Sequence, residues 1–318
     1  MGELPKERVQ PSRAFLNTGV DFCGPILVKT SNRRNSKAEN AYAALFVCFA
    51  TKAIHLELVS DLSTPAFLGA LKRFFARRGK ARKMFSDNGG NFVGAQRELH
   101  RLFLNASQSD EMKNYLSGEN IEWSFIPPRS PNFGGLWEAG VKAFKYHFKR
   151  ILGQAMLTFE EMTTVTAMIE SCLNSRPLCP LSSDPNDLSP LTPGHFLIGD
   201  VLTAIPQPDI LDSKVSTLKR WHRVEFMLQQ FWSRWSKEYL SILQSRTKWK
   251  KEEENLQLGQ LVLLKEEHLP PLKWPLGRII DVHPGPDGSV RVATIKTSAG
   301  IYKRSISRIC LLPIENFT

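Results

Sequence analysis

The chain has 318 residues, with 42 Lys and Arg against 31 Asp and Glu, and therefore a net charge of +11. A basic excess of this size indicates a polyanionic partner, and the sequence argues against a membrane partner because it has neither a long apolar span nor a basic amphipathic anchor. The length exceeds the usual size of one domain and predicts two globular units.

The charge is unevenly distributed along the chain. Residues 1–157 hold 23 basic and 13 acidic side chains, residues 158–213 hold 1 and 8, and residues 214–318 hold 18 and 10. Two basic lobes therefore flank an acidic connector. We expect the lobes to face the polyanionic partner and the connector to pack on protein or to face solvent.

The first half of the chain has the pattern of an α/β domain. After a polar segment at 1–14, which we expect to be poorly ordered, three strand patterns precede the first helix. The run at 41–50 lacks polar alternation, which is typical of a central strand buried on both faces. The expected elements of this core, assigned to residues 15–178, are strands at 19–29, 41–51, 53–60, 82–87 and 121–127 and helices at 64–78, 91–104, 134–153 and 158–175.

The second half begins with a connector at 179–213 that is rich in Pro, Ser and Asp. A long amphipathic helix is expected at 214–250, with an aromatic stripe from Trp221 to Leu243. Helical spacing favours a packing face, against another domain or a second protomer, over a platform on which bases stack. Residues 251–318 then contain short strand patterns at 261–264, 277–282, 290–295 and 307–312, separated by turns.

Three carboxylates occupy positions suited to a metal site. Asp21 lies inside the apolar run 19–28, where an unpaired charge is costly without a cation or donors. Asp87 ends a strand pattern and precedes Gly89 and Gly90, which we expect to allow a positive φ and an open approach. Glu138 falls in the first turn of the expected helix at 134–153. Together they indicate phosphodiester chemistry.

Lysines follow Glu138 along one helical face. Glu138, Lys142, Lys145 and Lys149 are spaced at i, i+4, i+7 and i+11. The alternative is an ordinary solvated face, but an acid at the head of a basic row favours a site that holds a nucleic-acid backbone beside a metal.

These motifs carry a family resemblance. Residues 18–22 (TGVDF), 86–92 (SDNGGNF) and 131–138 (PNFGGLWE) resemble the catalytic core of retroelement integrases, and most of all the integrase of BEL/Pao-type LTR retrotransposons. The spacing of 51 residues from Asp87 to Glu138 is longer than in retroviral integrases, as in that group. The resemblance implies an RNase H-like fold, a mixed five-stranded sheet flanked by helices, followed by the long helix and a small SH3-like β-barrel that binds DNA.

The resemblance also implies an activity and its ligands. Asp21, Asp87 and Glu138 would hold two Mg²⁺ ions, with Asp21 bridging them and Mn²⁺ able to substitute, for 3′-end processing and strand transfer by a polynucleotidyl transferase. The partners would be double-stranded DNA and further copies of the chain, in the nucleus after a cytoplasmic stage. The candidate DNA contacts are Asn91, Asn132, Lys142, Lys145, Lys149, Arg278, Arg291, Lys303 and Arg304, with Lys273, Lys296 and Arg308 as further basic candidates in the barrel.

Other interpretations remain open. Integrases of this kind carry a His-His-Cys-Cys zinc module, and no such spacing precedes Asp21, so we expect no zinc in this chain; a polyprotein fragment and a truncated or domesticated copy both fit. The five cysteines form no CxxC pair and are expected to be reduced core residues. His55 and His100 are expected to be structural. The rival functions are a catalytically silent DNA-binding protein and a stand-alone RNase H-like nuclease.

Overall fold

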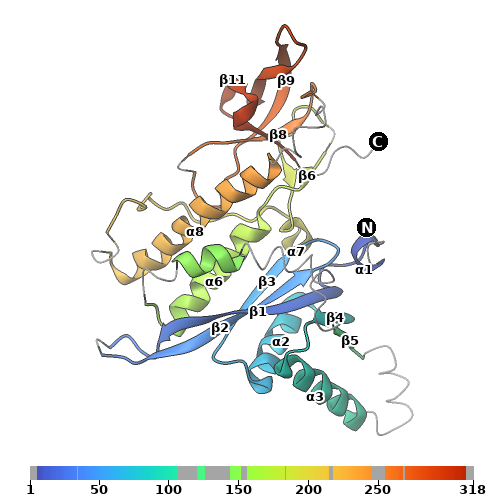
Figure 1. Ribbon diagram of the computed structural model, residues 1–318, viewed down its shortest axis with the longest axis vertical. Coiled ribbons are helices and arrows are strands. Elements are labelled where there is room, and N and C mark those ends of the chain that lie inside the picture. The colour runs from blue at the N-terminus through green and yellow to red at the C-terminus, as the bar shows by residue number, and fades with distance from the viewer. Residues whose placement is uncertain are drawn as a thin grey trace. The chain divides into compact units, whose positions relative to one another are not determined.

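The protein is described from a computed structural model (Figure 1), which places residues 6–33, 35–106, 120–125, 144–151, 156–182, 184–214, 218–244, 255–267 and 269–312. The chain divides into two compact units, one of residues 1–173 and 214–227 and the other of residues 174–213 and 228–318. The long helix α8 (Arg220–Leu243) begins in the first unit and continues into the second. No helix within these described ranges is long and apolar enough to cross a bilayer.

A mixed five-stranded sheet forms the centre of the first unit. Its order is β3-β2-β1-β4-β5, in which β1, β2 and β3 are antiparallel and β4 and β5 run parallel to β1. This order and these directions are those of the RNase H-like fold, and they confirm the predicted fold class. The strands are β1 (Asn17–Lys29), β2 (Ala38–Cys48), β3 (Ile54–Val59), β4 (Lys83–Ser86) and β5 (Glu122–Phe125).

Helices cover both faces of this sheet. In Figure 1, α2 and α3 lie on one side of the sheet and α6 lies on the other. The expected helix at 134–153 is described only over residues 144–151, which are helical. A short N-terminal helix, α1, was not predicted. The helix bounds are α1 (Lys6–Val9), α2 (Thr64–Arg78), α3 (Gly90–Ala106) and α6 (Phe159–Asn174).

Local sequence signals explain the ends of α2. The Ser63 hydroxyl accepts a hydrogen bond from the Ala66 amide at 3.3 Å, and Pro65 lies in the first turn, where its missing N–H costs nothing. The helix ends at Gly79, whose φ of 82° strains any residue with a Cβ. Phe67 and Phe74 are fully buried on its inner face. The predicted bounds of 64–78 are confirmed.

The second unit contains a smaller antiparallel sheet in the order β11-β10-β9-β8-β12. It fits the expected SH3-like barrel region, with a core that includes Val262, Ile279 and Ile295. The edge strand β11 was not predicted, because all six of its residues lack a buried face. The elements are β8 (Leu261–Leu264), β9 (Leu276–Pro284), β10 (Val290–Thr297), β11 (Gly300–Ser305), the 3₁₀ helix η3 (Ile306–Arg308) and β12 (Ile309–Leu311).

Strand β8 is apolar at every position because both of its faces are covered. Val262 and Leu264 point into the barrel core, whereas Leu261 and Leu263 belong to a second cluster with Leu240 of α8. The connector that precedes α8 along the chain also belongs to this unit. It contains β6 (Cys179–Pro180), β7 (Pro190–Leu191) and α7 (His195–Ile198).

The aromatic stripe of α8 packs inside the second unit. Trp232 and Trp235 are 3% and 5% exposed, and both contact Trp274, with ring centroids 4.8 Å and 5.7 Å away. Tyr239 joins the same cluster and donates a hydrogen bond to the Pro177 carbonyl at 2.5 Å. The interpretation as a packing face is therefore confirmed for this part of the stripe, whereas Trp221 at its start is 58% exposed. A stacking platform or a protomer contact is wrong for Trp232 and Trp235, which the chain itself covers.

Candidate active site

Asp21 and Asp87 are brought together by the parallel pairing of β1 and β4. Gly19 is the partner of Phe85 at the end of this ladder, two residues before Asp21 on β1 and two residues before Asp87, which directly follows β4. Neighbouring strands lie about 4.8 Å apart and paired residues point to the same face. The fold thus brings the segments that carry the two carboxylates to neighbouring strands at the centre of the sheet, although the residues are 66 apart in sequence.

Asp21 is half-buried and makes two hydrogen bonds. Its Oδ1 accepts from the Phe22 amide at 2.7 Å, and its Oδ2 accepts from the Lys145 ammonium at 2.9 Å. Burial and the charge of Asp21 raise the pKa of the neighbouring Cys23 thiol to about 11, although the charges of Lys145 and Lys149 act in the opposite direction. The thiol therefore stays protonated and unreactive beside the carboxylate.

Asp87 is exposed, and the turn that follows it approaches closely. Its Oδ1 accepts from the Gly89 amide at 2.9 Å, and a Cβ added at Gly89 would lie only 3.0 Å from that oxygen. Neither Gly89 nor Gly90 has a positive φ, so the expected reason for these glycines is wrong. Gly89 is needed for space beside the carboxylate, whereas a Cβ at Gly90 would meet nothing within 4 Å.

The next candidate, Asn91, lies in the first turn of α3. Its side-chain oxygen accepts from the Phe92 amide at 3.0 Å, and the residue is half-buried. The first turn of a helix carries unpaired amides and a partial positive charge, which suits a phosphate oxygen. Its place beside Asp87 in the chain keeps Asn91 a candidate DNA contact.

The lysine ladder is described in part. Glu138, Lys142 and Asn132 lie outside the described residues. Lys145 and Lys149 are described on the helix at 144–151, where Lys149 is exposed and both charges act on Cys23. The ladder therefore reaches the carboxylate site, and the ion pair between Lys145 and Asp21 is a contact that the sequence did not predict.

The donor chemistry of the site suits a hard divalent cation. Asp21 on β1 and Asp87, which directly follows β4, offer carboxylate oxygens, and Mg²⁺ prefers oxygen ligands that leave room for water. Within the described ranges, no group of three or more His, Cys, Asp or Glu side chains is arranged to hold a metal ion. The two described carboxylates supply the oxygen ligands that Mg²⁺ prefers, and the magnesium site stays a prediction.

The barrel residues expected to contact DNA differ in their surroundings. Arg278 is 7% exposed, and its guanidinium donates to the carbonyls of Gly259, Asp184 and Asp187 at 2.6–3.0 Å. Because the guanidinium donates these hydrogen bonds to backbone carbonyls and is buried, it is not accessible to a DNA phosphate. The expectation of a phosphate contact is therefore wrong for Arg278. Arg291 is exposed and paired with Asp287 at 2.7 Å.

Lys303 and Arg304 lie on the edge strand β11. Lys303 is exposed, whereas Arg304 is half-buried, with its guanidinium over the Tyr302 ring at 5.1 Å and 3.8 Å from Glu266. Both stay candidate phosphate contacts. Of the further basic candidates, Lys273, Lys296 and Arg308 are also exposed.

A buried charge network in the first unit was missed. His55 lies between two buried glutamates, with Nε2 at 3.0 Å from Glu57 and Nδ1 at 3.1 Å from Glu170. Burial by itself lowers the pKa of His55, but hydrogen bonds and charges from the two glutamates outweigh it and raise the pKa. His55 is structural, as expected. His55 and Glu57 at alternate positions of the apolar strand β3 were the available signal, since a buried Glu needs a partner.

The cysteine expectation is confirmed, because all five cysteines are free and buried.

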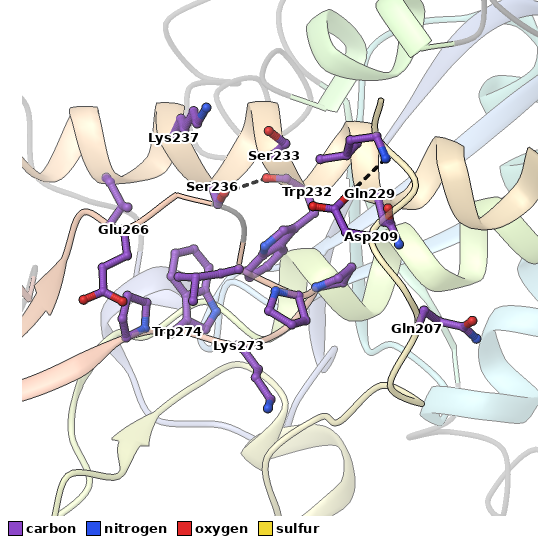
Figure 2. A pocket seen from close by; sticks show the side chains of 16 residues that line it. Gln207, Asp209, Gln229, Trp232, Ser233, Ser236, Lys237, Glu266, Lys273 and Trp274 are labelled. Carbon is purple, nitrogen blue, oxygen red and sulfur yellow. Dashed lines mark hydrogen bonds between the residues drawn. The ribbon is translucent and has the colours of Figure 1, made fainter. Parts of the chain in front are cut away.

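A pocket of about 190 Å³ lies within the second unit (Figure 2). Trp232 and Trp274 line it, and Gln229 fixes one wall by bonding to the Pro208 carbonyl and the Ile210 amide. Its charged lining residues are Asp209, Lys237, Glu266 and Lys273.

Comparisons with known proteins add two observations. Residues 219–312 match a family of unknown function (DUF5641), which spans α8 and the barrel. Among curated proteins, no sequence matches the chain.

Two solved structures are similar at low identity. A chain in the cryo-EM structure of the simian T-cell lymphotropic virus intasome with the PP2A regulatory subunit B56 gamma is 11% identical, with a TM-score of 0.37 over 99% of this chain and 85% of that chain. The catalytic core domain of BIV integrase is 11% identical, with a TM-score of 0.35 over 58% of this chain and 95% of that chain. The fold assignment rests on the strand order and not on these similarities.

The first unit is thus an RNase H-like domain. Its strand order supplies the scaffold, and the pairing of β1 with β4 brings together the segments that carry Asp21 and Asp87.

Proposed function

We propose that the protein is a DNA integrase of the BEL/Pao type that performs 3′-end processing and strand transfer. The observations that support the proposal are the parallel pairing of β1 with β4, which ends two residues before Asp21 and Asp87, and a lysine ammonium 2.9 Å from Asp21. A pair of carboxylates beside a cationic helix suits phosphodiester chemistry, in which a metal and a phosphate must be held together.

The described side chains divide the work of such a reaction. Asp21 and Asp87, together with Glu138, are proposed to hold two Mg²⁺ ions, which when bound activate the attacking oxygen and stabilise the leaving 3′ oxygen. Lys145 and Lys149 hold DNA phosphates next to these carboxylates. Gly89 keeps the space beside Asp87 free of a side chain. Water is the nucleophile in end processing, and the new 3′-hydroxyl is the nucleophile in joining.

The proposed substrate is double-stranded DNA, both the element's ends and the target. The net charge of +11 supports a polyanionic substrate, and the exposed Lys303 on β11 suits contact with the backbone. Each carboxylate site processes one end at a time, so insertion of two ends requires at least two copies of the chain. An integrase acts on nuclear DNA, so we place its action in the nucleus.

A strand-transfer assay with short duplex ends and a plasmid target tests the proposal. In Mg²⁺ or Mn²⁺, the chain is expected to shorten the 3′ ends and to join them to the target. Asp21→Asn and Asp87→Asn should abolish both products and leave DNA binding nearly unchanged, because each removes a metal ligand with little change in volume. Asp61→Asn, an exposed acid at the end of β3, is the matched control and should retain activity.

The other outcomes identify the rival functions. Cleavage without joining would indicate a nuclease, and DNA binding without either product, including with a chain extended upstream, would indicate a catalytically silent DNA-binding protein. Joining by Asp21→Asn at the wild-type rate would remove Asp21 from the site.

A further inference from the structure

Asp87 lies beyond the end of the β ladder that positions the residues before it. Strand β4 ends at Ser86, whose ladder partner on β5 is Phe125, and Asp87 directly follows it. Two other hydrogen bonds hold Asp87: its carbonyl accepts from the Ser86 hydroxyl at 2.8 Å, and its Oδ1 accepts from the Gly89 amide at 2.9 Å. The first bond fixes the peptide plane that leads into the turn, and the turn places the amide that orients the carboxylate.

A second bond connects the Ser86 hydroxyl to β5. Ser86 is fully buried, and its Oγ accepts from the Trp123 indole nitrogen at 2.9 Å. Trp123 is the partner of Met84 in the parallel ladder, so its side chain lies on the same face of the sheet as that of Ser86. The three groups form a short relay, from the indole N–H through the hydroxyl to the Asp87 carbonyl.

The direction of this relay follows from the hydrogen-bonding capacity of its two ends. An indole N–H can only donate, and a backbone carbonyl can only accept. The hydroxyl between them must therefore accept from Trp123 and donate to Asp87. Without the indole, the hydroxyl would be free to rotate away from the carbonyl. Without the hydroxyl, the indole would have no link to Asp87. The two side chains are therefore expected to act as one unit.

An aromatic cluster holds the indole in place. The Trp123 ring lies edge-to-face with the ring of Phe67 on α2, with centroids 6.1 Å apart, and Phe67 is fully buried. Phe67 also contacts Phe92 of α3 at 4.9 Å, and Phe92 stacks on Phe22 at 5.3 Å. Phe22 directly follows Asp21 on β1. The relay therefore begins in the same packed cluster that supports the strand of Asp21.

We propose that Trp123 and Ser86 are positioning residues, which orient the Asp87 carboxylate for a divalent cation and contact neither the cation nor DNA. This role rests on the proposed function, in which Asp87 is a metal ligand, and it gives β5 a part in the site. A tryptophan that served only the packing of the core would not need its N–H to meet Ser86. Phenylalanine would then replace it without an effect on metal binding.

Binding of Mn²⁺ to the full chain without DNA tests the proposal, with the electron paramagnetic resonance signal of the free ion as the measure of affinity. Asp87→Asn identifies the affinity that belongs to this site. Ser86→Ala and Trp123→Phe should each weaken that affinity by about tenfold, because outer hydrogen-bond partners of metal ligands have effects of this order. The double variant should bind no more weakly than Ser86→Ala, since one substitution already breaks the relay.

Strand-transfer kinetics separate positioning from a general loss of structure. In Ser86→Ala and Trp123→Phe, the rate of joining at saturating DNA should fall, whereas the DNA concentration that gives half the maximal rate should stay the same. The matched control is Ser171→Ala on α6, which removes a hydroxyl that donates to the Met168 carbonyl at 2.7 Å and should change neither quantity. Melting temperatures check folding, and if Ser86→Ala does not fold, Trp123→Phe decides alone.

The relay and the integrase function can fail separately. If the wild-type chain joins no DNA but the Mn²⁺ affinities follow the expected pattern, the relay stands and the integrase function is refuted. The relay is overturned if the wild-type chain does not bind Mn²⁺ or if Asp87→Asn binds it equally well. It is also overturned if Trp123→Phe binds Mn²⁺ as tightly as the wild type, or if the effects of the two substitutions add in the double variant.

Discussion

The charge network on β3 makes a quantitative prediction about stability. Glu170 is buried and accepts three bonds: from the Leu56 amide at 2.7 Å, from His55 at 3.1 Å and from Arg78 at 2.5 Å. Replacement by Ala removes the negative charge and leaves a buried amide and a buried imidazole without their acceptor. Breaking a buried pair by removal of one partner costs about 3–5 kcal/mol, so Glu170→Ala should lower the free energy of unfolding by about that amount.

Two measurements separate this effect from a general loss of stability. Urea unfolding followed by circular dichroism gives the free energy, and hydrogen exchange of peptides covering residues 54–59 reports on the Leu56 amide, which should exchange faster in the variant. The control is Glu98→Ala, which removes a carboxylate that is 33% exposed and paired with Arg101 on α3 and should leave stability nearly unchanged.

The result that would refute this reasoning is a loss of less than about 1 kcal/mol in Glu170→Ala. Unchanged exchange of the Leu56 amide would contradict it as well. Either outcome would mean that Glu170 does not hold the edge of β3 in solution.

Four further predictions concern the site, the charge network and the second unit. The double variant Asp21→Asn/Asp87→Asn should be little less active in strand transfer than either single variant, because residues that act as a unit are not additive; a much larger loss in the double variant would mean independent roles. Lys145→Gln should weaken binding to duplex ends and reduce the slope of log K against log[salt] by about 0.9, while Lys29→Gln, a charge change on β1, serves as the control; an unchanged slope would leave Lys145 as a partner of Asp21 alone. The pKa of His55 is raised in the folded protein, so its contribution to stability is complete below its unfolded pKa of about 6.5 and is lost as the pH rises through the higher folded pKa. Urea unfolding measured across this pH range should show the free energy of unfolding falling in the wild type, and this fall should be absent in His55→Gln. Trp235→Ala should destabilise the second unit by about 3–5 kcal/mol and reduce the near-UV circular dichroism, and a change below about 1 kcal/mol would contradict its place in the aromatic cluster.

The elements of the first unit were predictable from local pattern. Strand and helix periods, the cap at Ser63 and the terminating Gly79 give α2 its bounds without any tertiary information. The order of elements, three strands and then alternating helices and strands, agrees with the RNase H-like sheet that the family resemblance implied. Strand β11 was missed because an exposed edge strand has no buried face and therefore no alternation to detect.

The site was predictable in its residue types but not in its contacts. Asp21 and Asp87 stood out because each lies in or directly after an apolar run, where a carboxylate is costly without a cation or hydrogen-bond donors nearby. The pairing of Asp21 with Lys145, 124 residues away, has no local signal. Nor does the burial of Arg278, which in sequence looks like any basic residue of a strand and in the fold bonds to three carbonyls.

The amino-acid sequence alone established the secondary structure, the two carboxylates and the basic character of the chain, because these depend on residue type and on spacing within one element. Tertiary packing decided which charged side chains are exposed to solvent and can contact a ligand. Glu57, Glu170 and Arg278 are held inside by partners far away in sequence, while Arg77 and Lys303 remain at the surface. The difference arises because the free energy of a charge depends on its solvent and its neighbours, and both are set by how elements pack and not by the order of residues within them.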